Sequence, residues 1–137
     1  MTVVLDCNII VMSLTSKSAY HRIYQALVRG DFELAVSDDI VLEYEEIIAR
    51  KYRPSTAKAF LSLLRELPNV FHTSIYFNFH LIQSDPDDNK YVDCAITARA
   101  AYIVTEDKHF NILKQIPFPK VATLSINGFM DILKRDA

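Results

Sequence analysis

The stretch TVVLDCN, residues 2–8, holds a short apolar run that ends directly at an acidic side chain. Val3, Val4 and Leu5 are apolar and mostly β-branched, which is typical of a short buried strand. Asp6 follows at the carboxyl end of that predicted strand. In open α/β sheets, ligands bind beyond the carboxyl ends of the strands, so the position of Asp6 directs attention to that edge.

Strand and helix patterns alternate along the rest of the chain. Short apolar runs predict further strands at residues 32–36, 70–73, 102–104 and 121–124. Apolar residues at helical spacing predict helices at about residues 20–28, 38–48, 56–67, 88–96, 108–114 and 126–133. This alternation predicts parallel β-α-β units, and therefore an α/β fold: a three-layer α/β/α sandwich around a central, mainly parallel sheet. We expect residues 1–137 to form one domain.

Capping residues mark several of the expected helix ends. Ser37, Ser55 and Ser125 are predicted N-caps, because a serine hydroxyl can accept a hydrogen bond from a free backbone N–H of the first turn. Gly30 is a predicted C-cap.

The composition excludes several classes of site. The only glycines, Gly30 and Gly128, rule out glycine-rich phosphate loops, and two cysteines are too few for a disulfide framework. Fifteen basic and seventeen acidic residues give a net charge of −2, so the chain has no global basic footprint for nucleic acid. With no signal-peptide pattern and no apolar run of membrane-spanning length, we expect a cytoplasmic protein without membrane association.

Two acidic residues follow predicted strands, and two lie on predicted helices. Asp6 and Asp107 come just after the strands at residues 3–5 and 102–104. Asp88 is expected in the first turn of its helix, three residues before Tyr91 and on the same buried face.

Glu43 lies on or beside the apolar stripe of its helix, three residues after Ile40 and four before Ile47. Four converging carboxylates with no inward lysine or arginine would repel one another and raise one another's pKa values. A divalent cation removes that conflict, and an all-oxygen site favours Mg²⁺ or Mn²⁺.

Four ordered motifs carry a family resemblance: VLDCNIIV at residues 4–11, SDDIVLEY at 37–44, DPDDNKYVDCA at 85–95 and AYIVTEDKHF at 101–110. In order and spacing they resemble the PIN-domain nucleases, above all the branch of toxin components from bacterial toxin–antitoxin pairs. The resemblance spans roughly the whole chain. It implies a PIN-like fold and a metal-dependent endoribonuclease that cleaves single-stranded RNA. It further implies a small antitoxin protein as partner, and we expect a homodimer.

By this resemblance, Asp6, Glu43, Asp88 and Asp107 form the catalytic and metal-binding acidic cluster, with Mg²⁺ or Mn²⁺ as the cofactor. Asn8 and Thr105 are the supporting polar residues.

The third acid of the set is open among Asp85, Asp87 and Asp88. Helix phase favours Asp88, since it points Asp88 inward and Asp93 outward.

Other candidates have a structural interpretation beside the functional one. Residues 50, 51 and 53 (Arg50, Lys51 and Arg53) form a small basic cluster that fits either a phosphate contact or a solvated helix end. His109 stands out among four scattered histidines because it lies two residues from Asp107. The aromatic segment 75–82 is a candidate contact surface for a partner.

Two other functions remain as alternatives. A phosphatase of the haloacid dehalogenase type also places an aspartate after its first strand, but it needs a second aspartate at the position of Asn8. A non-catalytic PIN-like scaffold would bind RNA or a partner without cutting, and the intact set of four acids argues against it.

Overall fold

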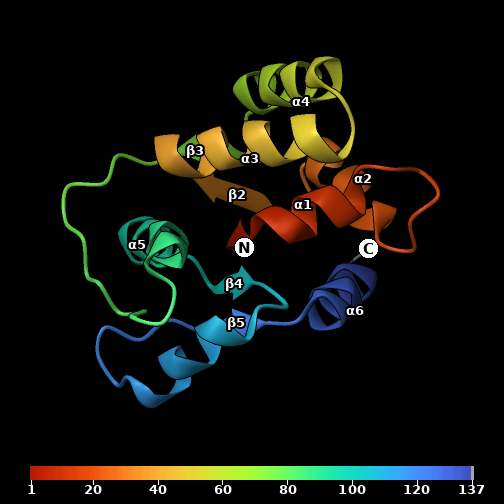
Figure 1. The fold of residues 1–137 in the computed structure, drawn as a ribbon. Coiled ribbons are helices and arrows are strands. Elements are labelled where there is room, and N and C mark those ends of the chain that lie inside the picture. The colour runs from red at the N-terminus through yellow and green to blue at the C-terminus, as the bar shows by residue number, and fades with distance from the viewer. Residues whose placement is uncertain (137) are drawn as a thin grey trace.

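A five-stranded, entirely parallel sheet forms the centre of the protein in the computed structural model, which describes residues 1–136 (Figure 1). The strands follow the order β3-β2-β1-β4-β5, so the first strand lies in the middle. Their bounds are Thr2–Leu5 for β1, Glu33–Val36 for β2, Val70–His72 for β3, Tyr102–Val104 for β4 and Thr123–Leu124 for β5.

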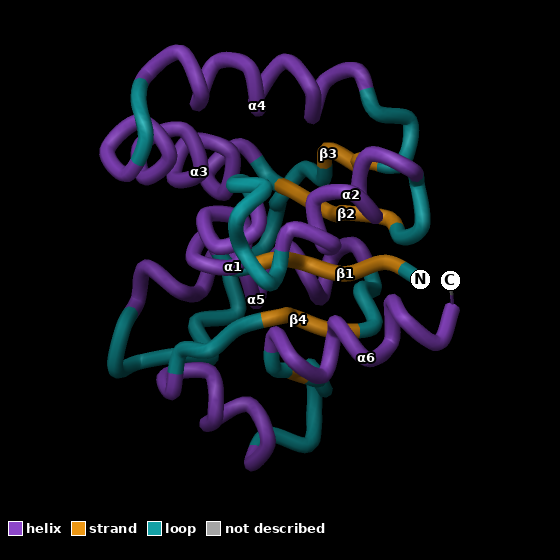
Figure 2. Tube along the Cα trace, turned by 90° about the vertical axis from the view of Figure 1, so that its right-hand side faces the viewer, coloured by secondary structure: helices purple, strands orange, loops and turns teal. Residues whose placement is uncertain are grey.

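Helices cover both faces of the sheet. Helices α1, α2 and α6 lie on one face and α5 lies on the other, while α3 packs against α1, α4 and α5 (Figures 1 and 2). The α-helices span Cys7–Ser13 (α1), His21–Arg29 (α2), Asp38–Lys51 (α3), Pro54–Glu66 (α4), Asn89–Ala98 (α5) and Ile126–Asp136 (α6). Two 3₁₀ segments, η1 at Pro86–Asp88 and η2 at Lys108–Gln115, complete the order. This arrangement confirms the predicted α/β/α sandwich.

Most of the expected caps are present. The Ser37 side chain accepts a hydrogen bond from the N–H of Ile40, and Ser125 accepts one from the N–H of Gly128 at 3.0 Å. Gly30 adopts the left-handed conformation with φ of 80°. The predicted cap at Ser55 is wrong: α4 begins one residue earlier, at Pro54, whose fixed φ suits the first helical position.

The end of β1 is held in place by backbone and tyrosine hydrogen bonds. The N–H of Asp6 donates to the carbonyl of Val104 at 3.0 Å, which extends the pairing of β1 and β4 by one residue. The fully buried Tyr44 of α3 donates its hydroxyl to the carbonyl of Leu5. Asp6 therefore stands on a fixed backbone at the carboxyl edge of the sheet.

The segment between β3 and η1 contains no helix or strand, and two side chains of α5 hold it. The amide of Asn89 both accepts from the N–H of Ile82 and donates to its carbonyl. Asp93 accepts a hydrogen bond from the N–H of Phe79 at 3.0 Å. The prediction that Asp93 points outward is wrong, because its residue is only 3% exposed. Helix phase alone missed it, since the loop folds over this side of α5.

None of the helices in residues 1–136 combines the length and the apolar character needed to cross a membrane.

Candidate active site

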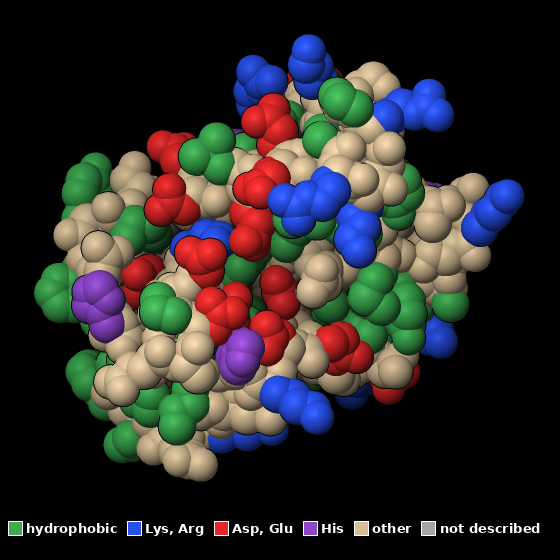
Figure 3. Space-filling model, in the orientation of Figure 1, with side chains coloured by type: hydrophobic (Ala, Val, Ile, Leu, Met, Phe, Trp, Pro, Cys, Tyr) green, Lys and Arg blue, Asp and Glu red, His purple; other side chains and the backbone are tan. Residues whose placement is uncertain are grey.

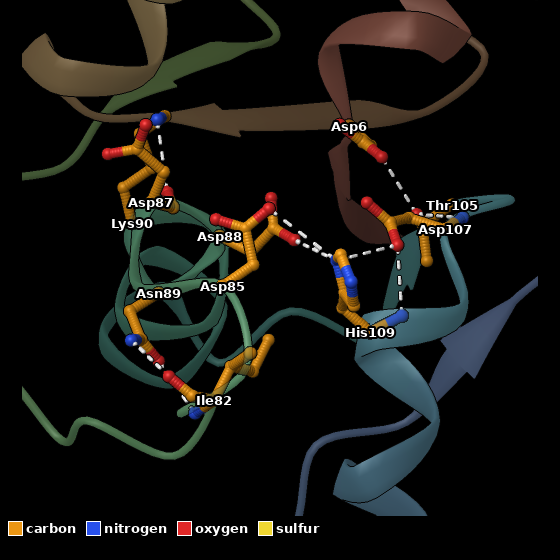
Figure 4. Close-up of polar contacts among 10 residues, drawn as sticks. All are labelled: Asp6, Ile82, Asp85, Asp87, Asp88, Asn89, Lys90, Thr105, Asp107 and His109. Atoms are coloured by element: carbon orange, nitrogen blue, oxygen red, sulfur yellow. Dashed lines mark hydrogen bonds and ion pairs between the residues drawn. The ribbon is translucent and has the colours of Figure 1, made fainter.

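Asp6 and Asp107 are linked through the hydroxyl of Thr105. The Thr105 Oγ1 atom donates to Oδ2 of Asp6 at 2.8 Å and accepts from the N–H of Asp107 at 3.0 Å (Figure 4). Neighbouring strands β1 and β4 carry these residues at their carboxyl ends, so the pairing of the two strands brings the two acids together. Thr105 thus has the supporting position that the resemblance implies.

The Asp6 carboxyl is held in an environment that disfavours its charge. The residue is 6% exposed, and burial raises its pKa above the ordinary value. The Thr105 hydrogen bond acts in the opposite direction, while the charges of Glu43 and Asp107 raise the pKa further. Asp6 is therefore a buried acid whose ionised form needs additional positive charge.

Three further carboxylates meet around one imidazole ring. The Nδ1 atom of His109 lies 3.1 Å from Oδ1 of Asp107 and 3.5 Å from an oxygen of both Asp85 and Asp88. Asp88 lies in η1, Asp85 directly precedes that segment and Asp107 lies in the turn after β4, and Figure 4 shows all three facing the His109 ring. The predicted acids Asp88 and Asp107 therefore converge, and Asp85 and His109 join them.

Asp88 is the most perturbed acid of this group. Burial, followed by the charges of Asp85, Asp107 and Asp6, raises its pKa from 3.8 to about 7. Its Oδ2 atom is buried and accepts no hydrogen bond from any residue in 1–136. The His109 Nδ1 atom at 3.5 Å is too distant for a well-formed hydrogen bond, so this oxygen lacks the partner that a buried charge requires.

The structure separates the three aspartates that compete for the third position. Asp88 and Asp85 both face His109, whereas Asp87 is exposed and lies on the other side of the turn (Figure 4). Helix phase did not predict that Asp85 also faces His109. Asp85 precedes the helical turns, so it has no position in the helical repeat.

Glu43 is held by two residues of α5. Its carboxylate accepts from the hydroxyl of Tyr91, and its other oxygen lies 3.2 Å from Nζ of Lys90. The Tyr91 oxygen also accepts from the N–H of Cys7 at 3.2 Å, which joins Glu43 to the end of β1.

The expectation that no basic side chain joins the acids is wrong. The Lys90 side chain is only 16% exposed and pairs directly with Glu43, which offsets one of the negative charges. The sequence contained a signal for Tyr91, which follows Asp88 by three residues and so lies on the same helix face. It contained none for Lys90, which follows Asp88 by two.

The acid cluster fits a divalent cation. Ligand atoms of Asp85, Asp88, Asp107 and His109 all lie within 4.8 Å of one another. Burial raises the pKa values of Asp6 and Asp88, although His109 lowers that of Asp88, and one Asp88 oxygen accepts no hydrogen bond within residues 1–136. Carboxylate oxygens that lie together and lack partners are the ligands that Mg²⁺ and Mn²⁺ take in proteins.

Comparison with known families identifies the family of this chain. A family model described as PIN domain matches residues 2–109. The chain belongs to the PIN-domain family. This confirms the family resemblance of the four motifs and sets aside the haloacid dehalogenase alternative. No curated protein sequence matches the chain at a significant level.

Two solved structures share the fold of this PIN domain. A chain in the crystal structure of VapBC2 from Rickettsia felis, bound to a DNA fragment from their promoter, superimposes with a TM-score of 0.62 at 15% identity, over 91% of this chain and 98% of that one. A chain of VapBC-1 from nontypeable Haemophilus influenzae gives 0.61 at 17% identity, over 93% and 99%.

The remaining predicted residues lie around the acids of the PIN domain. Asn8 is exposed in the first turn of α1, two residues from Asp6. The basic cluster lies where α3 ends and α4 begins, and Arg50 pairs with Glu46 at 2.8 Å. Along the helix axis, Arg50 is roughly 10 Å from Glu43. Figure 3 shows acidic side chains gathered down the middle of this face, with lysines and arginines at its margins.

The raised pKa of Asp88 predicts a pH-dependent effect of removing its charge. An acid whose pKa is raised in the folded state stabilises the protein below its unfolded pKa, and this contribution is lost as the pH rises through about 7. In EDTA, Asp88→Asn should therefore be more stable than wild type by about 1–2 kcal/mol at about pH 8, and nearly equal to it at about pH 4.

Urea unfolding at both pH values measures this difference. Asp87→Asn is the matched control, because Asp87 is the exposed neighbour outside the cluster, and it should match wild type at both. Equal stability of Asp88→Asn and wild type at the higher pH would contradict the perturbed environment of Asp88.

Proposed function

We propose that this PIN domain is a divalent-metal-dependent endoribonuclease that cleaves single-stranded RNA in the cytoplasm. The observation that carries the proposal is the unpartnered Asp88 oxygen inside a group of acids at the carboxyl ends of β1 and β4. Membership of the PIN-domain family supports the nuclease chemistry, and the four-acid set supports the requirement for a cation. A non-catalytic scaffold would have no use for an arrangement that buries Asp6 and Asp88 beside other acids.

The proposed ligands are Asp6, Glu43, Asp88 and Asp107, with Mg²⁺ or Mn²⁺ as the cofactor. When bound, such a cation lowers the pKa of a water and stabilises charge on phosphate oxygens. Asp85 lies beside this set and adds a fifth carboxylate to it.

The other residues position these acids. Thr105 fixes Asp6 and the backbone at Asp107 through its hydroxyl, and Tyr91 with Lys90 fixes Glu43. Support of this kind orients the ligands of a metal site and tunes their basicity. A carboxylate of this set that remains free of the cation is suited to accept the proton of the attacking water. The exposed amide of Asn8 is suited to hold a phosphate oxygen.

RNA would approach across the acidic face from its basic margin. Arg50, Lys51 and Arg53 are exposed at the end of α3 and the start of α4, where they can contact phosphates without sequence preference. The net charge is −2, so the molecule as a whole does not attract the negatively charged RNA. In this proposal the local basic patch supplies the attraction to the phosphates.

We further propose that the chain is the toxin of a toxin–antitoxin pair, and that it forms a homodimer and binds a small antitoxin. The motif resemblance and the fold shared with the VapBC structures support this assignment. Residues 75–82 are the proposed contact surface. Within them Tyr76 is 92% exposed and Phe77 is also exposed, which contradicts a role for these two rings in the core of the chain. Light scattering at micromolar concentration should give the mass of two chains, and the mass of one chain would rule out the dimer.

The nuclease proposal predicts cleavage that depends on both metal and acids. Purified protein should cut single-stranded RNA in Mg²⁺ or Mn²⁺ and lose activity in EDTA, with recovery when the ion is restored. Asp6→Asn and Asp107→Asn should each lower the rate by about 100-fold or more, since each removes a proposed ligand.

Asp131→Asn is the control for the cleavage assay. Asp131 is an exposed acid on α6, outside the cluster, and this variant should retain the wild-type rate. Full cleavage in EDTA after careful metal removal would overturn the proposed mechanism, and folded, metal-loaded protein without any cleavage would favour the non-catalytic scaffold.

A further inference from the structure

The group of acids at the candidate site contains one nitrogen ligand. The Nδ1 atom of His109 belongs to the same set as the oxygens of Asp85, Asp88 and Asp107, all within 4.8 Å of one another. The histidine ring is about half exposed, so no packing against the core requires it to face the carboxylates (Figure 4). Its orientation toward three acids at once is therefore a feature of the site.

The separations between these atoms suit ligands of one ion. Two ligands at adjacent corners of an octahedron, with bonds of about 2.1 Å, lie about 3.0 Å apart. The Nδ1 atom of His109 lies 3.1 Å from the Asp107 oxygen and 3.5 Å from the oxygens of Asp85 and Asp88. The three oxygens and the nitrogen all lie within 4.8 Å of one another, somewhat more than the roughly 4.2 Å that separates opposite corners of such an octahedron, so the four atoms would move closer together around a bound ion.

The local backbone holds the imidazole at this place. Asp107 caps η2, and its Oδ1 atom accepts the N–H of His109 at 2.9 Å. The same turn thus presents a carboxylate oxygen and an imidazole nitrogen on one side. Across from them lies the Asp88 oxygen that accepts no hydrogen bond within residues 1–136.

We propose that His109 is a direct nitrogen ligand of the divalent cation, beside Asp85, Asp88 and Asp107, and that it makes the site select Mn²⁺ over Mg²⁺. The inference rests on the proposed function and refines it: Asp88 and Asp107 remain direct ligands, Asp85 and His109 join them, and Asp6 and Glu43, which lie outside this group of atoms, support the site from its border. Imidazole is a suitable ligand for transition metals, whereas Mg²⁺ takes oxygen ligands almost exclusively. Of the two ions proposed for this site, Mn²⁺ is the transition metal, so a nitrogen ligand should favour it over Mg²⁺.

The test measures metal binding directly, with MnCl₂ and MgCl₂ as the probes. Calorimetric titration of the wild-type protein at one fixed, slightly alkaline pH should give an affinity for Mn²⁺ about ten-fold or more above that for Mg²⁺. Pulsed electron paramagnetic resonance of the Mn²⁺-loaded protein should show coupling to a directly bound ¹⁴N nucleus.

Two substitutions of His109 test its role in metal binding. His109→Gln should lose the nitrogen coupling and about ten-fold in Mn²⁺ affinity, while Mg²⁺ affinity changes less than about two-fold. His109→Asp, which makes the set all-oxygen, should raise Mg²⁺ affinity and bring the two ions close together. His72→Gln is the matched control and should behave as wild type. His72 is exposed on β3, the outermost strand on the side of the sheet away from β4.

The opposite outcomes overturn the inference. Absence of ¹⁴N coupling in the loaded wild type would exclude His109 as a ligand. Tighter Mn²⁺ binding by His109→Gln would show instead that the ring acts as a competing internal cation. These readouts are independent of cleavage. A protein that binds Mn²⁺ through a nitrogen but cuts no RNA would refute the nuclease proposal alone. Metal-dependent cleavage without the nitrogen coupling would refute only the role of His109.

Discussion

The pairing of β1 with β4 is the constraint on which the rest of the site depends. The ladder continues past the last strand residues through the hydrogen bond from the N–H of Asp6 to the carbonyl of Val104. This contact fixes Asp6 beside Thr105, whose hydroxyl then ties the Asp6 carboxylate to the backbone at Asp107. Because the sheet is parallel, both acids have to emerge at the same edge. The end of η1, directly before α5, then adds Asp88 to them.

The same geometry concentrates negative charge where water is scarce. Asp6 and Asp88 both have raised pKa values, chiefly through burial. The protein offsets this cost locally in two ways: Lys90 pairs with Glu43, and His109 faces the other acids. Neither contact gives the buried Asp88 oxygen a good hydrogen bond. The charged forms of Asp6 and Asp88 are therefore costly at this edge of the sheet, which is the cost that the proposed cation would relieve.

The sequence predicted the parts of this structure that depend on local pattern. The apolar runs located the strands, so Asp6 and Asp107 could be placed at strand ends before the sheet was known, and the capping serines at 37 and 125 were correct. The contacts that complete the site were harder to predict. The ion pair of Lys90 with Glu43 joins α5 to α3, which are far apart in the sequence. Asp85 contacts His109 from an irregular segment that has no helical or strand periodicity. Asp93 was misplaced for a related reason: the loop that buries it carries no helix or strand pattern.

The central claim is that the acids share one cation site, and thermal melting of wild type and Asp6→Asn tests it most directly. In EDTA, Asp6→Asn should melt at a higher temperature than wild type, because one of several repelling carboxylates has been neutralised. A millimolar divalent ion should then stabilise wild type by about 1–3 kcal/mol and the variant by less, as expected for a ligand that binds only the folded state. If the two proteins melt together both with and without Mg²⁺ or Mn²⁺, the acids do not form a shared cation site and the account is wrong.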